Sequence, residues 1–245
     1  MLRFGGVVAL DGASLAVRPG EVVGLIGPNG AGKTTLLNVM AGLLRPQGGQ
    51  VLLDGADITR LGPAARARRG LVRSFQIARE LGRLTVLENL LLAAPAQRGE
   101  AVWQALLRPR LVAAEERANA ARALAILTRI GLRAKADDLA AGLSGGQKKL
   151  LELGRALMLR PRVVLLDEPA AGVAPPLVQE LARLVRELAA EGIGFALVEH
   201  DMALVQQVCD RVQVLAEGRP LAAGSFAEVT ADRRVVDAYL GGMAA

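Results

Sequence analysis

Residues 27–34 of the sequence read GPNGAGKT, which matches the pattern G-x-x-x-x-G-K-[ST]. The apolar run VVGLI precedes this motif, and a helix-like segment follows it. Glycines in such a loop let backbone N–H groups turn toward phosphate oxygens, and the helix places its positive dipole end there. Lys33 then reaches the β- and γ-phosphates, and the Thr34 hydroxyl is placed to bind Mg²⁺. The stretch therefore predicts a strand, a phosphate-binding loop and a helix.

The remaining apolar runs extend this pattern to an α/β fold with a largely parallel sheet. Residues 163–166 (VVLL) and 194–198 (GFALV) are short and continuously apolar, like 22–26, which is typical of strands buried on both faces. The early chain differs, because strand-like pieces at 7–17, 21–26 and 50–53 are separated by RPG at 18–20 and QGG at 47–49. We expect these turn signals to join antiparallel hairpins.

The middle of the chain, residues 85–159, is predicted to be helical. Thr85 and Glu88 have the spacing of a capping box. Residues 112–130 form an amphipathic segment in which three apolar side chains share one face, namely Leu124, Leu127 and Ile130. Trp103 is expected to be a packing residue rather than a ligand contact.

Composition restricts the class of protein further. The chain has 245 residues, of which 52% are hydrophobic, but no run approaches the roughly 18 apolar residues that a membrane span needs. We find no secretory signal at the start of the sequence and expect a cytoplasmic protein. Cys209 is the single cysteine; it excludes an internal disulfide and a multi-cysteine metal site, and it is expected to act as a small buried hydrophobe.

The formal net charge of +6 is compatible with an anionic partner such as nucleic acid or a lipid surface. Aromatic residues make up only 2% of the chain, which argues against single-stranded nucleic acid because such binding needs stacking surfaces. We expect the clustered arginines to form a solvated face. They are Arg60, Arg66, Arg68, Arg69, Arg73, Arg79 and Arg83.

Two further motifs lie in the second half of the chain. Asp167 and Glu168 follow the predicted strand 163–166, so one carboxylate can hold hydrated Mg²⁺ and the other can activate a water molecule. Residues 143–147 read LSGGQ, in which Ser144 and Gln147 have capping-box spacing and two glycines leave the helix N-terminus open to a phosphate. Two separate phosphate-seeking helix starts suggest that each completes a nucleotide site with half of a second subunit.

The sequence contains GPNGAGKTT, LSGGQ, VVLLDEP and a lone histidine in LVEHD. With these motifs it resembles the ATP-binding subunits of ATP-binding cassette (ABC) transporters over essentially its whole length. The resemblance implies a P-loop NTPase with a RecA-like core, an antiparallel β-subdomain and an inserted helical subdomain. In this sequence the core and β-subdomain would comprise residues 1–75 and 160–245, and the helical subdomain about 77–158.

The resemblance also implies which residues act on ATP and Mg²⁺. Glu168, His200 and Gln76 would be catalytic, and Thr34, Gln76 and Asp167 would hold the metal. Phe4 would stack on adenine. The other nucleotide contacts would come from Asn29, Gly30, Gly32, Lys33, Thr34 and Thr35 on one subunit and from Ser144, Gly145, Gly146 and Gln147 on the opposite one.

Within the family, the sequence is similar to the longer ATPase subunit of branched-chain amino acid importers; urea or short-chain amide importers and lipopolysaccharide exporters are the alternatives. The implied partners are a second copy or a sister ATPase, integral membrane permeases and, indirectly, a periplasmic solute-binding protein, with no nucleic acid. The subunit would lie on the inner face of the cell membrane.

Two positions depart from the family pattern. Ala174 stands where an acid or Asn usually reaches across the dimer, which puts coupling between subunits in question and leaves open a regulatory subunit with little turnover. Only three residues precede Phe4, although a strand usually comes before this aromatic residue, so either the sequence starts late or the β-subdomain lacks an edge strand and holds Phe4 loosely. A cytosolic cassette ATPase acting on DNA or ribosomes is the alternative from another class.

Overall fold

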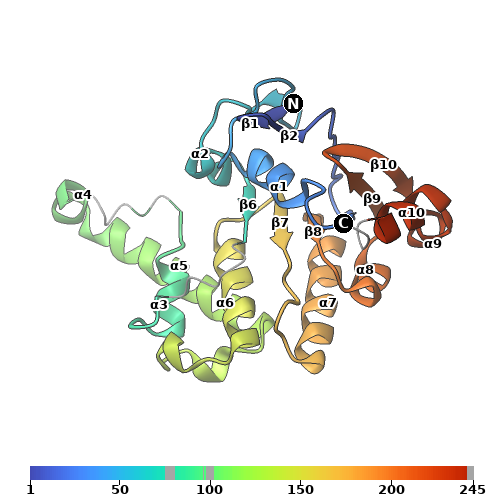
Figure 1. The fold of residues 1–245 in the computed structure, drawn as a ribbon. Helices are drawn as coiled ribbons and strands as arrows, with labels where there is room; N and C mark the ends of the chain where they lie inside the picture. Colours follow the sequence, from blue (N-terminus) through green and yellow to red (C-terminus); the bar gives the residue numbers. More distant parts are fainter. Residues whose placement is uncertain (75–80, 96, 98–101, 242–245) are drawn as a thin grey trace. The chain divides into compact units, whose positions relative to one another are not determined.

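The computed structural model describes residues 1–74, 81–95, 97 and 102–241. Its chain divides into two compact units, one of residues 1–76, 162–171 and 175–245, and the other of residues 77–161 and 172–174. Figure 1 labels their helices and strands. The domain roles that the resemblance implies remain a prediction.

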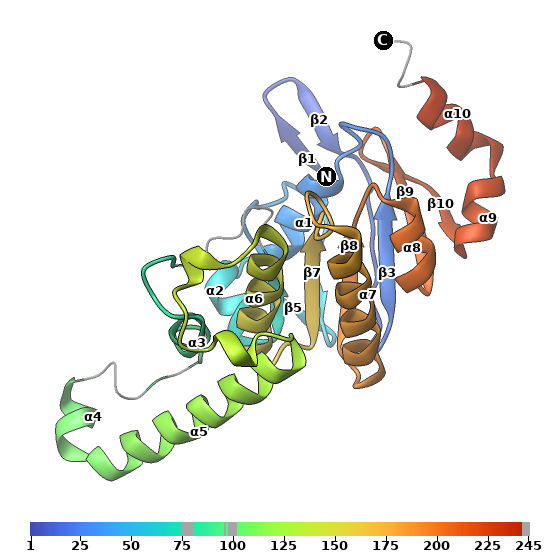
Figure 2. The same cartoon turned by 90° about the horizontal axis from the view of Figure 1, so that it is seen from below.

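The first unit is built on a six-stranded sheet with the order β10-β9-β3-β8-β7-β6. Antiparallel pairing joins β10 to β9, and the other neighbours are parallel, as Figure 2 shows for β3, β7 and β8. The strands are β3 Val22–Ile26, β6 Leu71–Arg73, β7 Val163–Asp167, β8 Gly194–Val198, β9 Arg211–Ala216 and β10 Arg219–Gly224. The α/β architecture and the three buried strands predicted from the sequence are confirmed, with one more residue, Asp167, in β7.

Helices cover both faces of this sheet because successive strand residues point to opposite sides. Leu25 packs in a buried cluster with Leu36 and Leu37 of α1, whereas Ile26 packs in a second cluster with Val205 of α8 and Val229 of α9. The helices of this unit are α1 Lys33–Ala41, α2 Pro63–Arg68, α7 Pro175–Ala190, α8 Met202–Val208, α9 Phe226–Ala231 and α10 Arg233–Gly241.

The antiparallel hairpins were predicted at the wrong turns. The sheet includes β3 between β8 and β9, so the turn at 18–20 does not form a hairpin. Separate two-stranded sheets join β1 Leu2–Phe4 to β2 Val7–Leu10 and β4 Leu52–Leu53 to β5 Ala56–Asp57. Residues 11–17 are not a strand. Phe4 is the last residue of β1 and pairs with Val7, so the alternative in which the β-subdomain lacks an edge strand is wrong.

The second unit is helical. It contains α3 Val86–Leu91, α4 Val102–Leu107, α5 Pro109–Arg129 and α6 Gly145–Met158, with two 3₁₀ turns at Arg133–Lys135 and Ala140–Gly142. The capping box of Thr85 and Glu88 is present, and Leu127 and Ile130 are buried while Leu124 is half-buried. No helix among residues 1–74, 81–95 and 102–241 is long and apolar enough to cross a membrane.

Two expectations about side chains need correction. Trp103 of α4 is 77% exposed, and Leu106 and Leu107 beside it are also exposed, so this tryptophan does not pack in a core of its unit. Arg66 is buried and the side chain of Arg73 is only 9% exposed, so neither lies on a solvated face, because both bond to groups of their own unit. The guanidinium of Arg66 donates to the carbonyls of Val39 and Met40, at the end of α1, and to those of Thr59 and Leu61.

Exposure differs among the other clustered arginines. Arg60, Arg68, Arg69 and Arg83 are exposed, whereas Arg79 lies outside the described residues.

Candidate nucleotide-binding and hydrolysis site

The parallel register brings the candidate residues of the first unit to one edge of the sheet. Leu25 of β3 is level with Val198 of β8, and Val198 is level with Asp167 of β7. The loops that follow these three strands therefore begin side by side at the carboxyl edge. Ligands of open α/β sheets bind outside this edge.

Glycine is required in the loop between β3 and α1. Gly27 has φ +150°, and a Cβ there would lie 2.0 Å from the carbonyl oxygen of Leu215. Gly32, the residue before α1, has φ +97°, and its Cβ would lie 2.7 Å from the carbonyl oxygen of Ala9. A side chain at either position would collide with backbone, so both positions require glycine for lack of space as well as for their positive φ angles.

Lys33 begins α1 and turns back into this loop. Its ammonium group donates to the carbonyl oxygens of Gly27 at 2.7 Å and Pro28 at 2.9 Å. Burial lowers the pKa of Lys33, while the negative charges of Glu168 and Asp167 oppose that shift. The loop thus holds a desolvated lysine beside a helix N-terminus, and both features attract phosphate.

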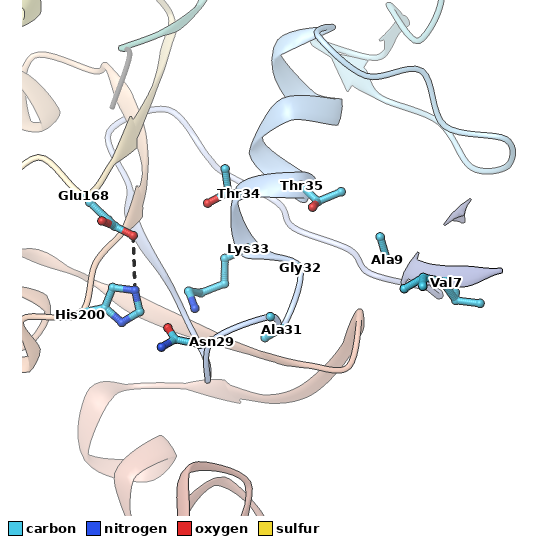
Figure 3. A pocket seen from close by; sticks show the side chains of 12 residues that line it. Val7, Ala9, Asn29, Ala31, Gly32, Lys33, Thr34, Thr35, Glu168 and His200 are labelled. Atoms are coloured by element: carbon cyan, nitrogen blue, oxygen red, sulfur yellow. Dashed lines mark ion pairs between the residues drawn. The ribbon is translucent and has the colours of Figure 1, made fainter. Parts of the chain in front are cut away.

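A pocket of about 300 Å³ opens over the loop (Figure 3). Glu168 and His200 line it together with the loop and part of β2. The loop residues are Asn29, Gly30, Ala31, Gly32, Lys33, Thr34 and Thr35, and the β2 residues are Val7, Val8 and Ala9. The structure therefore brings one acid, one imidazole and the phosphate-binding loop around a single cavity.

Asp167 and Glu168 have different surroundings. The side chain of Asp167 is fully buried, and its Oδ2 accepts from Arg73 Nη2 at 2.7 Å. Its Oδ1 is buried and has no hydrogen-bond partner in the described part of the chain. A buried carboxylate oxygen without a partner, on a residue whose negative charge acts on Lys33 of the loop, suits a hydrated divalent cation, so the residues present fit Mg²⁺.

Glu168 faces the pocket, and its Oε1 lies 3.4 Å from His200 Nε2 (Figure 3). Its backbone has φ +49°, in the left-handed region that non-glycine residues seldom adopt. The Glu168 N–H donates to the carbonyl oxygen of Val198 at 2.8 Å, which fastens this turn to the end of β8. A carboxylate and an imidazole in such contact can hold and move a proton.

LSGGQ lies in the second unit, where Ser144 caps α6. Ser144 Oγ accepts from the Gln147 N–H at 3.3 Å, and Gln147 Oε1 accepts from the Ser144 N–H at 3.0 Å. A Cβ at Gly145 would meet no atom within 4 Å, whereas Gly146 is buried. The capping box is confirmed, and the first glycine leaves the helix N-terminus open.

The other predicted residues are placed as follows. Phe4 is 50% exposed and lies beside Val7, which lines the pocket, although Phe4 itself does not. Gln76 lies outside the described residues.

Sequence reasoning missed the role of Arg73, which we assigned to a solvated face. The available signal was a charge directly after two apolar residues, at the end of the short segment Leu71–Arg73.

A largely parallel sheet with this loop, this lysine and these two carboxylates at its carboxyl edge defines a P-loop ATPase. The sequence profile described as ABC transporter matches residues 10–171, and one described as branched-chain amino acid ATP-binding cassette transporter matches residues 219–245. The chain belongs to the ABC transporter family, whose ATPase couples ATP hydrolysis to transport.

Individual relatives match along nearly the whole chain. The high-affinity branched-chain amino acid transport ATP-binding protein LivG of Escherichia coli strain K12 is 39% identical, covering 98% of this chain and 95% of that protein. The probable branched-chain amino acid transport ATP-binding protein LivG of Methanocaldococcus jannaschii is 41% identical, covering 97% of this chain and 93% of that protein. The crystal structure of an ATP-binding cassette of an ABC transporter in its ADP conformation superposes with a TM-score of 0.81 at 37% identity, covering 97% and 94%.

Proposed function

We propose that this chain binds and hydrolyses ATP to power an importer of branched-chain amino acids. The single observation that carries this proposal is the cavity shared by the phosphate-binding loop, Glu168 and His200. The substrate class is supported by the relatives' names and by the C-terminal match at residues 219–245.

ATP would bind with its phosphates on the loop after β3. The backbone N–H groups around Gly30 and Gly32 and the ammonium of Lys33 would hold the β- and γ-phosphates. Asn29 and Thr35 line the same cavity, and Phe4 would stack on adenine beside β2. Thr34, Asp167 and Gln76 would hold Mg²⁺, which neutralises phosphate charge when bound.

Glu168 would orient the attacking water and accept its proton, because its carboxylate points into the cavity next to the loop. His200 would contact the γ-phosphate from the neighbouring strand end. The 3.4 Å contact between Glu168 and His200 would keep the group that orients the water beside the group that contacts the γ-phosphate, and such alignment is worth several orders of magnitude in rate.

The open end of α6 would complete the site of a second subunit. Helix α6 is 14 residues long, and its capped N-terminus favours an anion. The residues at this N-terminus are Ser144, Gly145, Gly146 and Gln147. Two subunits would then bind two ATP molecules head to tail and dock on integral membrane permeases at the cytoplasmic face, with a periplasmic solute-binding protein delivering the amino acid.

Glu168→Gln tests the hydrolytic assignment. We expect ATP binding to persist while the ATPase rate falls by about 10²-fold or more, because the substitution keeps the shape and removes the proton acceptor. A wild-type rate in this variant would overturn the assignment. Control binding experiments with a fluorescent ATP analogue show whether the variant is folded.

Reconstitution with the permeases tests the substrate class. Leucine, isoleucine or valine carried by the binding protein should stimulate ATPase activity and be transported into vesicles. Stimulation by urea or a short-chain amide instead would assign the chain to the alternative importers. No turnover in the assembled transporter would favour the regulatory subunit suggested by Ala174.

A further inference from the structure

Glu199 is a buried carboxylate between the end of β8 and His200. Only 4% of the surface of Glu199 is exposed to solvent. Oε1 accepts from the Ala170 N–H at 2.6 Å, and Oε2 accepts from the N–H groups of His200 at 3.0 Å and Asp201 at 3.4 Å. One side chain therefore bonds to two loops that follow different strands, β7 and β8.

The loop held by Oε1 is the strained turn that carries Glu168. Glu168 has φ +49°, and Ala170 lies two residues further along the same turn, where the Ala171 N–H donates to the Glu168 carbonyl at 3.2 Å. A non-glycine residue keeps this conformation only where the surroundings fix it. The Glu199 carboxylate is one such restraint, and the Val198 carbonyl, bonded to the Glu168 N–H, is another.

We infer that Glu199 is a positioning residue for ATP hydrolysis, which holds the Glu168 turn and the His200 loop in register. The inference rests on the proposed roles of Glu168 and His200. It adds that their 3.4 Å contact depends on a third carboxylate that does not touch the nucleotide.

A carboxylate suits this position because the three groups that hydrogen-bond to it are all N–H donors. Ionised Glu accepts at both oxygens, whereas Gln presents an acceptor at one end and an NH₂ donor at the other. In Glu199→Gln, either Ala170 or the His200–Asp201 pair would face that NH₂ group and lose its partner. A buried N–H without a partner is costly, so one of the two loops is expected to move.

The experiment compares Glu199→Gln, Glu199→Asp and a matched control in steady-state ATPase assays. We expect Glu199→Gln to lower kcat by about 10²-fold, as small misalignments of reacting groups do, with the KM for ATP within about twofold of wild type. Glu199→Asp keeps both acceptors on a shorter side chain that cannot span both loops, so kcat should fall by about tenfold.

Glu21→Gln is the control. Its carboxylate also accepts a backbone N–H, from Arg18 at 2.9 Å, and contacts Arg211 Nε at 3.0 Å. Glu21 lies just before β3, at the opposite edge of the sheet from the site. The same chemical change at Glu21 should leave kcat unaltered.

The chain's single histidine gives a readout independent of turnover. In protein with ¹³C-labelled histidine, Glu199→Gln should shift the ring resonances of His200 in the same sense as Glu168→Gln, because both remove the Glu168 carboxylate from the imidazole. Unchanged resonances together with a kcat within twofold of wild type would overturn the inference. If Glu199→Gln does not fold, the kcat of Glu199→Asp tests the inference instead, and a wild-type kcat in that variant would overturn it.

The two proposals fail differently. A wild-type rate in Glu168→Gln would remove the proposed function. An inactive Glu168→Gln with normal kcat and normal His200 resonances in Glu199→Gln would remove only the role of Glu199.

Discussion

Arg73 Nη2 lies 2.7 Å from Asp167 Oδ2, and both side chains are almost fully withdrawn from solvent. The same guanidinium donates through Nη1 to Asn38 Oδ1 of α1. One arginine thus links strand β6, the helix after the phosphate-binding loop and the carboxylate proposed to hold Mg²⁺. Arg73 bonds to Oδ2 of Asp167, and Oδ1 has no hydrogen-bond partner in the described part of the chain.

Breaking this pair should be costly for folding. In Arg73→Met, Asp167 is left buried without its cation, and we expect the free energy of unfolding to fall by about 3 kcal/mol. Urea denaturation followed by circular dichroism measures the change. Arg183→Met removes the exposed pair with Glu187 and should cost less than about 1 kcal/mol; equal losses in both variants would contradict the prediction.

Gly27→Ala should abolish the native loop. The added Cβ would lie 2.0 Å from the Leu215 carbonyl oxygen, which is backbone and cannot turn away. We expect loss of ATP-analogue binding, with a drop in Tm. Gly12→Ala is the matched control, since Gly12 has φ +75° but a Cβ there meets nothing within 4 Å; it should cost only about 1–2 kcal/mol of conformational energy. Binding retained in Gly27→Ala would refute the expected clash.

As pH rises, ATP affinity should begin to fall at a lower pH than it would if Lys33 had the ordinary lysine pKa of 10.5. Burial lowers the pKa of Lys33 below 10.5 in the free protein, whereas bound phosphates favour the charged ammonium. Binding therefore takes up a proton as the pH approaches the lowered pKa, and affinity falls there. Titration of a fluorescent ATP analogue between pH 7 and 10 measures this. Lys33→Met should bind weakly at every pH; a wild-type decline in that variant would assign the effect to another group.

Cys209 should be unreactive in the folded protein. Burial raises the pKa of its thiol to about 12 from an ordinary 9.0, so almost no thiolate forms at pH 8. Ellman's reagent should titrate no thiol in the native protein and one after unfolding.

The same shift gives stability a defined pH dependence. Between pH 9 and 12 the folded state keeps the Cys209 proton that the unfolded state loses, so stability should fall as pH rises, by at most about 1.4 kcal/mol per unit. Cys209→Ser should lose this slope, and an unchanged slope would contradict the assignment.

Local patterns predicted much of the fold. Val22–Ile26 and Gly194–Val198 are strands as expected, because continuous apolar runs of this length are buried in parallel sheets. The caps at Thr85 and Ser144 are also present, since both bonds of a capping box join residues three apart. The prediction of hairpins was wrong because turn residues indicate where a chain bends but not which strands then pair.

By itself, the sequence determined the phosphate-binding loop, the acids after β7, the LSGGQ helix start and thereby the family. Each depends on residues close together in the chain, whose spacing is visible without a structure. Only the tertiary structure decided what surrounds them. Arg73 meets Asp167 across 94 positions, and Glu199 meets Ala170 across 29; such contacts follow from the order of strands in the sheet. Burial then gives these charges their importance, because a buried carboxylate needs a partner and a solvated one does not.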